Sequence, residues 1–444
     1  MSIEWFSIEW ITILMFGSLL AVLLAGTPVA FACGSIGMIF TVALLGPGGV
    51  NLAVVRTFTL MNQYLLAAIP LFIFMAAILE RSGIMEELYE VIYRWMGAIR
   101  GGVASATVVA CTILAAMVGV IGASETTMSM IALPEMFKRG YDKRLAMGAV
   151  LAGGTLGILI PPSVLMIVYG LVANESIGQL YAGSFLPGFL LSGLYIAYIT
   201  IRCSIRPEMG PPVPKEERIS FVEKLKLARG IVVPMVLVAL VLGIMFAGIA
   251  SPTEAAGVGA AGSILIVTLQ RKFSWSKLYQ ACDNTLKATA MVLWTIFGAN
   301  LFVALYIAVG GARFVEHSLL NSGLGRWGIL LFMQAILLFL GCFLDWVGIL
   351  MLTVPIFVPI IKTLGFDPIW FGVLFSVNLQ VSFLSPPFGY ALFYLAGVAG
   401  PRLGITTREI WWSALPFIAL QLIGLALCII FPQIILWAPQ VLYK

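Results

Sequence analysis

Long apolar segments, separated by short polar loops, recur along the whole chain. Most of them reach the roughly 20 residues that a helix needs to cross a hydrocarbon core. The pattern therefore predicts an all-α polytopic membrane protein, with three mixed segments at 48–64, 83–99 and 311–324 that are expected to be interfacial or amphipathic. The predicted spans lie at about 7–25, 28–46, 65–81, 145–172, 182–203, 230–249, 252–270, 286–309, 370–397 and 409–436.

Two further apolar stretches, 103–136 and 327–362, are interrupted near their middles by polar residues. Because both ends of the first stretch should lie on the same side of the membrane, it is predicted to be a re-entrant hairpin with its tip at 122–127. Ser124 is expected to cap the returning arm of this hairpin. In the second hairpin Asp345 is expected to cap the returning helix and to favour a cation nearby.

Adjacent prolines interrupt two of the predicted spans. Pro161-Pro162 lies within 145–172, and Pro386-Pro387 lies within 370–397. A proline inside a helix removes a backbone donor and costs about 3 kcal/mol, and the bilayer offers no water to the carbonyls that it frees. These spans are predicted to be broken helices whose carbonyls coordinate a cation. A proline kink that only shapes packing is the alternative.

The two halves of the chain repeat each other at one constant offset. Pro134 corresponds to Pro359, and the motif "GYD" that begins at Gly140 corresponds to "GFD" at Gly365. The two Pro-Pro pairs correspond at the same offset. This repetition predicts a first repeat at 1–206 and a second repeat at 230–444, joined by a Pro-rich, charged cytoplasmic linker at 207–229.

The basic residues indicate how the repeats are oriented. The loop of the first half carries Lys138, Arg139, Lys143 and Arg144, whereas its counterpart carries only Lys362. By the positive-inside rule the first loop is cytoplasmic and the second is external. The halves are therefore predicted to form an inverted structural repeat with both termini outside.

Composition restricts the function further. The 444 residues are 61% hydrophobic and 10% charged, and the net charge of +5 is distributed over short loops, so nucleic-acid binding is not expected. The six cysteines are scattered singly and there is one histidine, which argues against a disulfide framework or a zinc site. No cleaved signal peptide is evident at the N-terminus. Glu254 is expected to belong to a capping box that begins at Ser251.

An inverted repeat with helices broken at matching positions is typical of secondary transporters, which bind substrate and ions near the membrane midplane. The neutral oxygens before each Pro-Pro pair suit a sodium-like ion, because a proton relay usually recruits more acids or histidines. Glu125 is predicted to serve an ion site or to stabilise the tip, since an unpaired carboxylate at this depth is costly. The polar residues before the second pair are Asn378, Gln380, Ser382 and Ser385, placed approximately as Gly153, Thr155, Gly157 and Ile160 are before the first.

Three other functions are alternatives to secondary transport. A membrane-embedded enzyme would need an HExxH motif, paired aspartates or a Ser/His pair, and an ATP-driven permease in which the nucleotide site is on the same chain would need a P-loop. The sequence contains none of these motifs. A stand-alone sodium–dicarboxylate carrier of the same architecture stays open.

Four separated motifs carry a family resemblance. "GYDKRLAMGAVLAGGTLGILIPPS", "SPTEAAGVGA", "FLDWVGILMLTVPIFVPI" and "SPPFG" together resemble the large, DctM-type permease subunit of tripartite ATP-independent periplasmic (TRAP) transporters. The resemblance implies an elevator-type fold of the ion-transporter superfamily in the bacterial inner membrane, sodium coupling without another cofactor, and organic acids as substrates. It also implies two partners, a small four-helix (DctQ-type) membrane subunit, expected here as a separate polypeptide, and a periplasmic (DctP-type) substrate-binding protein.

The resemblance also implies the positions of the sites. One sodium site would use the tip at Ser124 with Gly157 and the carbonyls of Ile160 and Pro161. The substrate would lie between the two tips. No positively charged residue is evident at either tip, so a polyol or a keto acid stays open as the substrate. The second sodium site would use Asp345, Gly348, Ser382, Ser385 and Pro386, and the substrate candidates are Gly122, Glu125, Thr126, Thr155, Asn378 and Gln380.

Overall fold

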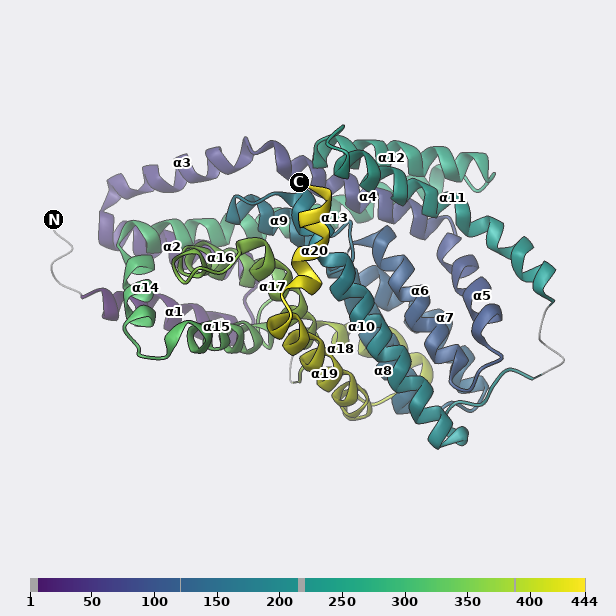
Figure 1. Ribbon diagram of the computed structural model, residues 1–444. Coiled ribbons are helices and arrows are strands. Elements are labelled where there is room, and N and C mark those ends of the chain that lie inside the picture. Colours follow the sequence, from purple (N-terminus) through teal and green to yellow (C-terminus); the bar gives the residue numbers. More distant parts are fainter. Residues whose placement is uncertain (1–6, 120, 215–219, 387–388, 444) are drawn as a thin grey trace.

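The computed structural model describes residues 7–119, 121–214, 220–386 and 389–443, and the regular elements within them are helices (Figure 1). Short 3₁₀ turns at Pro47–Gly49, Tyr64–Ala67, Leu156–Ile158 and Pro207–Met209 supplement the α-helices. The helices of the first half are α1 (Ile8–Leu24), α2 (Val29–Leu45), α3 (Val50–Met61), α4 (Ala68–Arg81), α5 (Ile84–Met96), α6 (Gly102–Val118), α7 (Ile121–Lys138), α8 (Lys143–Thr155), α9 (Val164–Ala173) and α10 (Ile177–Ile205). Those of the second half are α11 (Phe221–Phe246), α12 (Pro252–Leu269), α13 (Trp275–Ala308), α14 (Gly311–Leu320), α15 (Gly325–Gly341), α16 (Trp346–Thr363), α17 (Pro368–Leu384), α18 (Tyr390–Leu403), α19 (Thr407–Ile430) and α20 (Gln433–Leu442).

Both halves place the same elements in the same order. Each has a helix pair, a long stretch that is divided into α3 and α4 in the first half and is the single helix α13 in the second, a short helix, a hairpin, a broken helix and a long closing helix. The packing also repeats. The returning arm of the first hairpin, α7, packs on α18, and its counterpart α16 packs on α9. In the same way α8 packs on α19, and its counterpart α17 packs on α10. The fold is thus an all-α inverted repeat with two hairpins and two broken helices, as the sequence predicts.

The residues that match between the halves have matching structural roles. Gly140 and Gly365 both adopt the left-handed backbone conformation, with φ of +75° and +76°. Asp142 and Asp367 follow them and cap the next helix, where the carboxylate accepts the amide of Leu145 in α8 (2.9 Å) and that of Ile369 in α17 (2.7 Å). Glycine turns and N-caps therefore start both broken helices in the same way.

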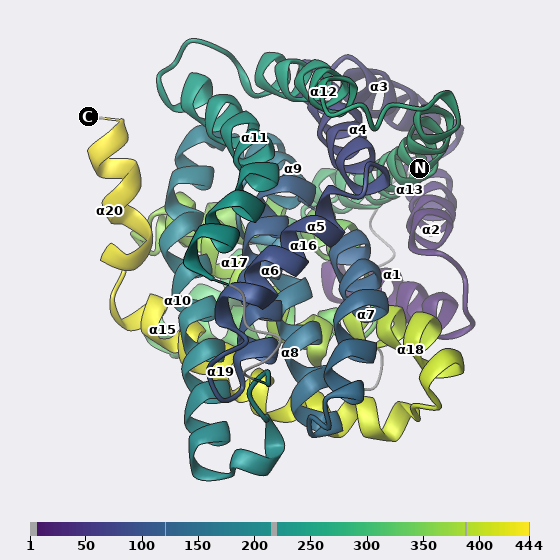
Figure 2. The same ribbon diagram turned by 90° about the vertical axis from the view of Figure 1, so that its right-hand side faces the viewer.

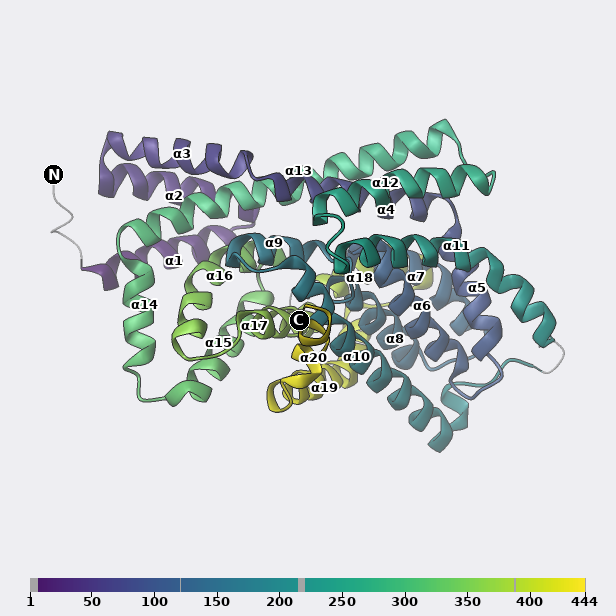
Figure 3. The same cartoon turned by 45° about the horizontal axis from the view of Figure 1, so that its top comes forward.

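Two groups of helices lie on opposite sides of the molecule. Figure 2 shows α2, α3, α4, α12 and α13 gathered on one side, and the hairpins and broken helices on the other. The 34-residue α13 runs the length of the first group, with α2 and α3 along one end and α4 along the other, and α12 packs on α4 (Figure 3). We call the first group the scaffold and the second group the core.

The structure differs from the predicted segments at two places. Segment 48–64, predicted to be interfacial or amphipathic, contains the short helix α3, whose Val54, Val55 and Phe58 are exposed. Segment 409–436 is divided into α19, which ends at Ile430, and α20, and Pro432 between them has no amide to donate to the last turn of α19. The helix α11 begins at Phe221, inside the segment predicted as linker.

A capping box accounts for the early start of α11. The Ser220 hydroxyl accepts the amide of Glu223 (3.4 Å), and the Glu223 carboxylate accepts the amide of Ser220 (2.9 Å). The capping box predicted at Ser251 is confirmed, since the Glu254 carboxylate accepts the Ser251 amide (2.7 Å).

Candidate transport site

The first hairpin turns earlier than predicted. Its arms are α6 and α7, and Gly119 ends α6 in the left-handed conformation with φ +66°. The polar segment 122–127 belongs to the first turns of α7, so Ser124 lies inside this helix and does not cap it. The physical reason is that Gly119 can adopt a positive φ without a steric penalty, so the chain can reverse before the polar segment begins.

The tip of this hairpin contacts the break in the first broken helix. The amide of Val164, the first residue of α9, donates to the carbonyl of Gly119 (3.4 Å). A Cβ atom added to Gly119 would overlap the Pro162 carbonyl oxygen. The hairpin tip and the proline break are therefore in direct backbone contact.

The second hairpin turns between α15 and α16, and its predicted cap is confirmed. Asp345 stands at the N-cap of α16, where its carboxylate accepts the Gly348 amide (3.1 Å). At the end of α15, Gly341 packs so closely on α17 that a Cβ there would overlap Ser382. The second hairpin is thereby held against the helix that leads to the second break.

Both predicted helix breaks are present. The first runs from the end of α8 at Thr155, through a 3₁₀ turn, to Val164, and the second lies between Leu384 and Tyr390. The Ile158 carbonyl accepts hydroxyl hydrogen bonds from Ser163 (2.5 Å) and Ser376 (3.1 Å). Pro387 lies outside the described residues.

Some backbone carbonyls at the breaks keep free lone pairs. Among the described residues, the carbonyls of Ile160 and Pro161 accept no hydrogen bond, and neither does that of Pro386. The Ser385 carbonyl accepts the Gly389 amide (3.1 Å), which leaves it one lone pair. Gly157 is buried in the 3₁₀ turn of the first break. These oxygens are available to a cation.

A cavity of about 540 Å³ lies between the two hairpin tips and the scaffold. The core side contributes Gly122 and Thr126 of α7, Asp345 at the N-cap of α16, and the rings of Tyr390 and Tyr394 of α18. The scaffold side consists of residues of α4 and α13. We call this cavity the tip chamber.

The scaffold side of the tip chamber adds three charged residues to Asp345 of the core side. Glu80 and Arg81 end α4, and Lys287 of α13 also lines the cavity. The Lys287 ammonium pairs with Asp283 (2.6 Å) one helical turn away. Sequence reasoning missed both cationic residues, because a charge at the end of a span is typical of an interfacial anchor and only the fold brings α4 and α13 against the tips.

Glu125 and Ser124 do not line the tip chamber. Glu125 is fully buried against α8, where a Cβ at Gly154 would overlap its carboxylate. Neither of its carboxylate oxygens has a hydrogen-bond partner among the described residues, and the same holds for the buried Ser124 hydroxyl. An unpartnered buried carboxylate is costly, so this pair is suited to a bound cation.

The remaining substrate candidates lie in the packed interior of the core. The Thr155 hydroxyl lies 3.4 Å from the Gln380 amide oxygen and accepts the side-chain amide of Gln421 of α19 (3.2 Å). Asn378 donates to the amide oxygen of Gln334 of α15 (2.6 Å). Because Thr155 and Gln380 occupy equivalent positions of the repeat and touch, they lie close to its two-fold axis. None of these side chains lines the tip chamber.

The two serines of the second predicted sodium site donate their hydroxyl protons to backbone carbonyls four residues earlier in the chain. The Ser382 hydroxyl donates to the Asn378 carbonyl (3.2 Å), and the Ser385 hydroxyl donates to the Val381 carbonyl (2.8 Å). A hydroxyl that donates in this way keeps its oxygen lone pairs for another ligand. The structure thus brings Gly122, Thr126 and Asp345 together in the tip chamber. Glu125 and Ser124 are buried outside that chamber.

Known proteins share both the sequence and the fold. The family model of the tripartite ATP-independent periplasmic transporter DctM component matches residues 16–434. The C4-dicarboxylate TRAP transporter large permease protein DctM of Pseudomonas aeruginosa is 32% identical over 401 residues, which cover 90% of this chain and 92% of that protein. The isethionate TRAP transporter permease protein DctMQ of Oleidesulfovibrio alaskensis is 29% identical, over 95% of this chain and 65% of that protein.

A solved structure agrees with the fold. The crystal structure of the Alcanivorax borkumensis YdaH transporter superposes with a TM-score of 0.62 over 87% of this chain and 89% of that one, at 15% sequence identity. Together with the family match over nearly the whole chain, this places the hairpins and broken helices in a transporter permease. The chain is thus a multi-pass inner-membrane protein, and it belongs to the DctM family, the large permease component of TRAP transporters.

Proposed function

We propose that this chain imports a small anionic organic solute, using a sodium gradient, by moving its core against its scaffold as an elevator. The observation that carries the proposal is the tip chamber, which both hairpin tips and the scaffold enclose. A site between two bodies changes its access when one body slides past the other, which is how inverted-repeat transporters achieve alternating access. The relatives are transporter permeases, which supports transport rather than catalysis.

Sodium coupling is supported by the oxygens near the breaks. Ser124 and Glu125 provide buried oxygens without protein partners, and the breaks provide the free carbonyls of Ile160, Pro161 and Pro386. Such a donor set consists of hard oxygen ligands, which alkali and alkaline-earth cations prefer. We therefore propose two sodium sites, one at each hairpin.

An anionic substrate is supported by Arg81 and Lys287, which give the tip chamber cationic groups that can meet a carboxylate or a sulfonate. The relatives named for C4-dicarboxylates and isethionate transport anions of these two kinds. A guanidinium group binds a carboxylate or a sulfonate, so the proposal includes both classes of anion.

Two partners complete the proposed transporter. A periplasmic binding protein delivers the solute, as the family implies. A small membrane subunit fits an apolar groove of about 700 Å³ on the scaffold, formed by α2, α3 and α13. Phe31 and Trp294 at this groove are each more than half exposed, and Gly34 and Gly298 let α2 and α13 approach closely. The support for a partner helix is the exposed apolar lining of the groove, because contiguous exposed apolar surface marks an interaction site.

Uptake by proteoliposomes tests this function. The vesicles contain this chain and its small membrane subunit, and they receive a binding protein loaded with labelled organic acid, with or without an inward sodium gradient. We expect uptake only when both the binding protein and sodium are present. Sodium-driven uptake without the binding protein would identify a stand-alone carrier, and uptake driven by a proton gradient alone would contradict sodium coupling.

Replacing Arg81 with glutamine should weaken capture of the substrate. A charge-assisted hydrogen bond contributes about 1.5–3 kcal/mol, and the exposed position of Arg81 places its effect at the low end, about tenfold in uptake at subsaturating substrate. Arg81→Lys keeps the charge and should retain part of the activity. The matched control is Arg313→Gln, an exposed arginine of α14 that does not line the tip chamber. Equal uptake by Arg81→Gln and the control would remove Arg81 from the substrate site.

A further inference from the structure

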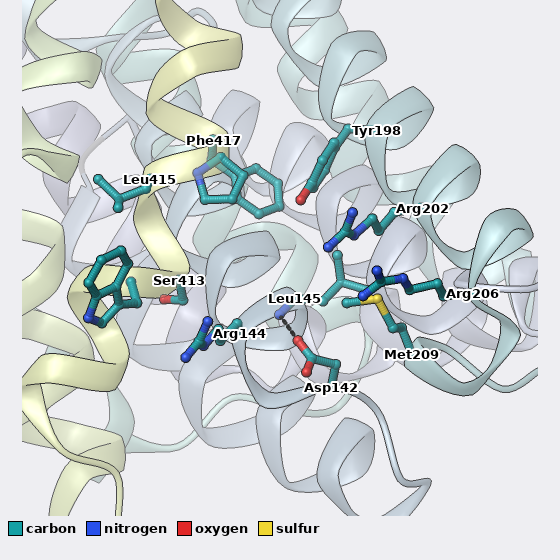
Figure 4. A pocket seen from close by; sticks show the side chains of 12 residues that line it. Asp142, Arg144, Leu145, Tyr198, Arg202, Arg206, Met209, Ser413, Leu415 and Phe417 are labelled. Atoms are coloured by element: carbon teal, nitrogen blue, oxygen red, sulfur yellow. Dashed lines mark hydrogen bonds between the residues drawn. The ribbon is translucent and has the colours of Figure 1, made fainter.

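A second cavity lies in the core, at the start of α8. It measures about 590 Å³ and is enclosed by the start of α8, the end of α10 and the first turns of α19 (Figure 4). The loop before α8 and the linker after α10 are the segments that the basic residues assign to the cytoplasm. The cavity is therefore at the cytoplasmic surface of the membrane, and we call it the arginine pocket.

Three arginines line the arginine pocket. Arg202 and Arg206 come from the end of α10, and Arg144 comes from the first turn of α8. Figure 4 shows the guanidinium groups of Arg202 and Arg206 next to each other on one side of the pocket, with Arg144 across from them. None of the three forms an ion pair or a side-chain hydrogen bond with any described residue, and the Arg202 Nε atom is buried without a partner.

The single acid of the lining does not neutralise these arginines. The Asp142 carboxylate accepts the Leu145 amide (2.9 Å) at the N-cap of α8, so its charge is directed toward the positive end of that helix. The lining therefore has three positive charges and one negative charge. A buried guanidinium nitrogen without a partner is costly, which favours an anionic ligand.

The remaining wall of the arginine pocket is apolar and faces the bilayer. Trp412 and Leu415 of α19 line it and are 50% and 44% exposed, although α19 is long and apolar enough to span the membrane. Trp412 stands one turn from the cytoplasmic end of α19, the depth at which tryptophan contacts both headgroups and acyl chains. A ligand that fills the pocket thus meets positive charge at one end and hydrocarbon at the other.

We propose that the arginine pocket binds the headgroup of an anionic phospholipid of the cytoplasmic leaflet. The phosphate oxygens accept hydrogen bonds from the guanidinium groups of Arg202, Arg206 and Arg144, and an acyl chain follows Trp412 and Leu415. Guanidinium groups match phosphate geometry, and basic pockets between membrane helices on this side attract anionic lipids. The apolar wall favours a lipid over a soluble phosphate, which would leave that wall uncovered.

A bound headgroup would connect three helices of the core. The pocket joins α8, α10 and α19, and the far part of α19 contacts α8 where Gln421 donates to Thr155. Anionic lipid should therefore raise the thermal stability of the folded protein, because a ligand that binds only the folded state stabilises it. This inference concerns binding of a lipid and does not depend on the proposed function.

Lipid binding by the purified full-length chain tests the proposal. Delipidated protein in detergent is titrated with phosphatidylglycerol, phosphatidylcholine or inorganic phosphate, while native mass spectrometry counts bound lipid and a melting curve reports stability. We expect one phosphatidylglycerol to bind and raise the melting temperature. The double variant Arg202→Gln/Arg206→Gln should bind it at least about tenfold more weakly, because each basic residue near a membrane surface contributes about 1 kcal/mol.

Matched variants and probes keep the test decisive. Arg94→Gln/Arg313→Gln removes two exposed arginines elsewhere and should bind phosphatidylglycerol as the unmodified chain does. The melting temperature of each variant without lipid shows whether it is folded. Equal binding by the two double variants would overturn the proposal, as would equal binding of phosphatidylcholine. Inorganic phosphate that stabilises as strongly as phosphatidylglycerol would replace the lipid with a soluble anion.

Discussion

Replacing Gly119 with alanine is expected to reduce sodium-driven uptake at least about tenfold. Gly119 has φ +66°, a conformation that costs a residue with a Cβ atom about 1–2 kcal/mol. The added Cβ would also overlap the backbone carbonyl oxygen of Pro162, which cannot rotate away as a flexible side chain can. The hairpin tip must then move away from the helix break that it contacts.

This movement would disturb the first proposed sodium site. The helix α7 starts two residues after Gly119 and carries Ser124 and Glu125, while Ile160 and Pro161 lie in the break on the other side of the contact. A displaced tip separates these two sets of oxygens. Uptake should therefore fall strongly while the melting temperature changes little. The loss of uptake should be greatest at low sodium concentration.

Gly140→Ala is the matched control for this prediction. Gly140 has φ +75°, and no atom lies within 4 Å of the Cβ position, so alanine there carries the same backbone strain without the overlap. Both variants are compared by uptake and by melting temperature in detergent. If the two variants lose uptake equally, backbone strain alone explains the loss, and the contact between tip and break has no special role.

The sequence predicted the features that depend on local chemistry. Adjacent prolines remove two successive backbone donors, and Asp345 followed by an apolar run is a capping position, so the breaks and the cap of the second hairpin were predictable. The left-handed turn at Gly119 was missed because the sequence around it, "MVGVIGASE", offers two glycines and a polar segment as competing turns. The choice between these turns depends on the tertiary contact with Pro162, which sequence patterns do not contain.

The charges of the tip chamber were missed for a different reason. Arg81 and Lys287 belong to the scaffold helices α4 and α13, outside both hairpins, and each resembles an ordinary charge at the end of a membrane span. The hairpin motifs belong to the core, so they predict only the core side of the binding site. A binding site formed between two bodies needs the packing of both, and that packing follows from many apolar contacts rather than from one motif.

Replacing Glu125 with glutamine is expected to raise the sodium concentration for half-maximal uptake by at least about tenfold. Glu125 is fully buried in the core, and its two carboxylate oxygens have no hydrogen-bond partner among the described residues. A charge in such a place needs a compensating charge, and a sodium ion supplies one. Glutamine keeps the size and one oxygen of the side chain but removes the charge. The free energy of sodium binding should therefore weaken by about 1.4 kcal/mol or more, which is the tenfold change expected.

Glu254→Gln is the control, because Glu254 is an exposed acid of a capping box and should leave the sodium dependence unchanged. Uptake is measured over a range of sodium concentrations with saturating loaded binding protein. A sodium dependence of Glu125→Gln equal to that of the unmodified chain would show that Glu125 packs as a neutral acid against Gly154. Asp345, at the tip of the second hairpin, would then be the remaining acid of the core beside which a coupling ion could bind, and the same titration of Asp345→Asn would follow.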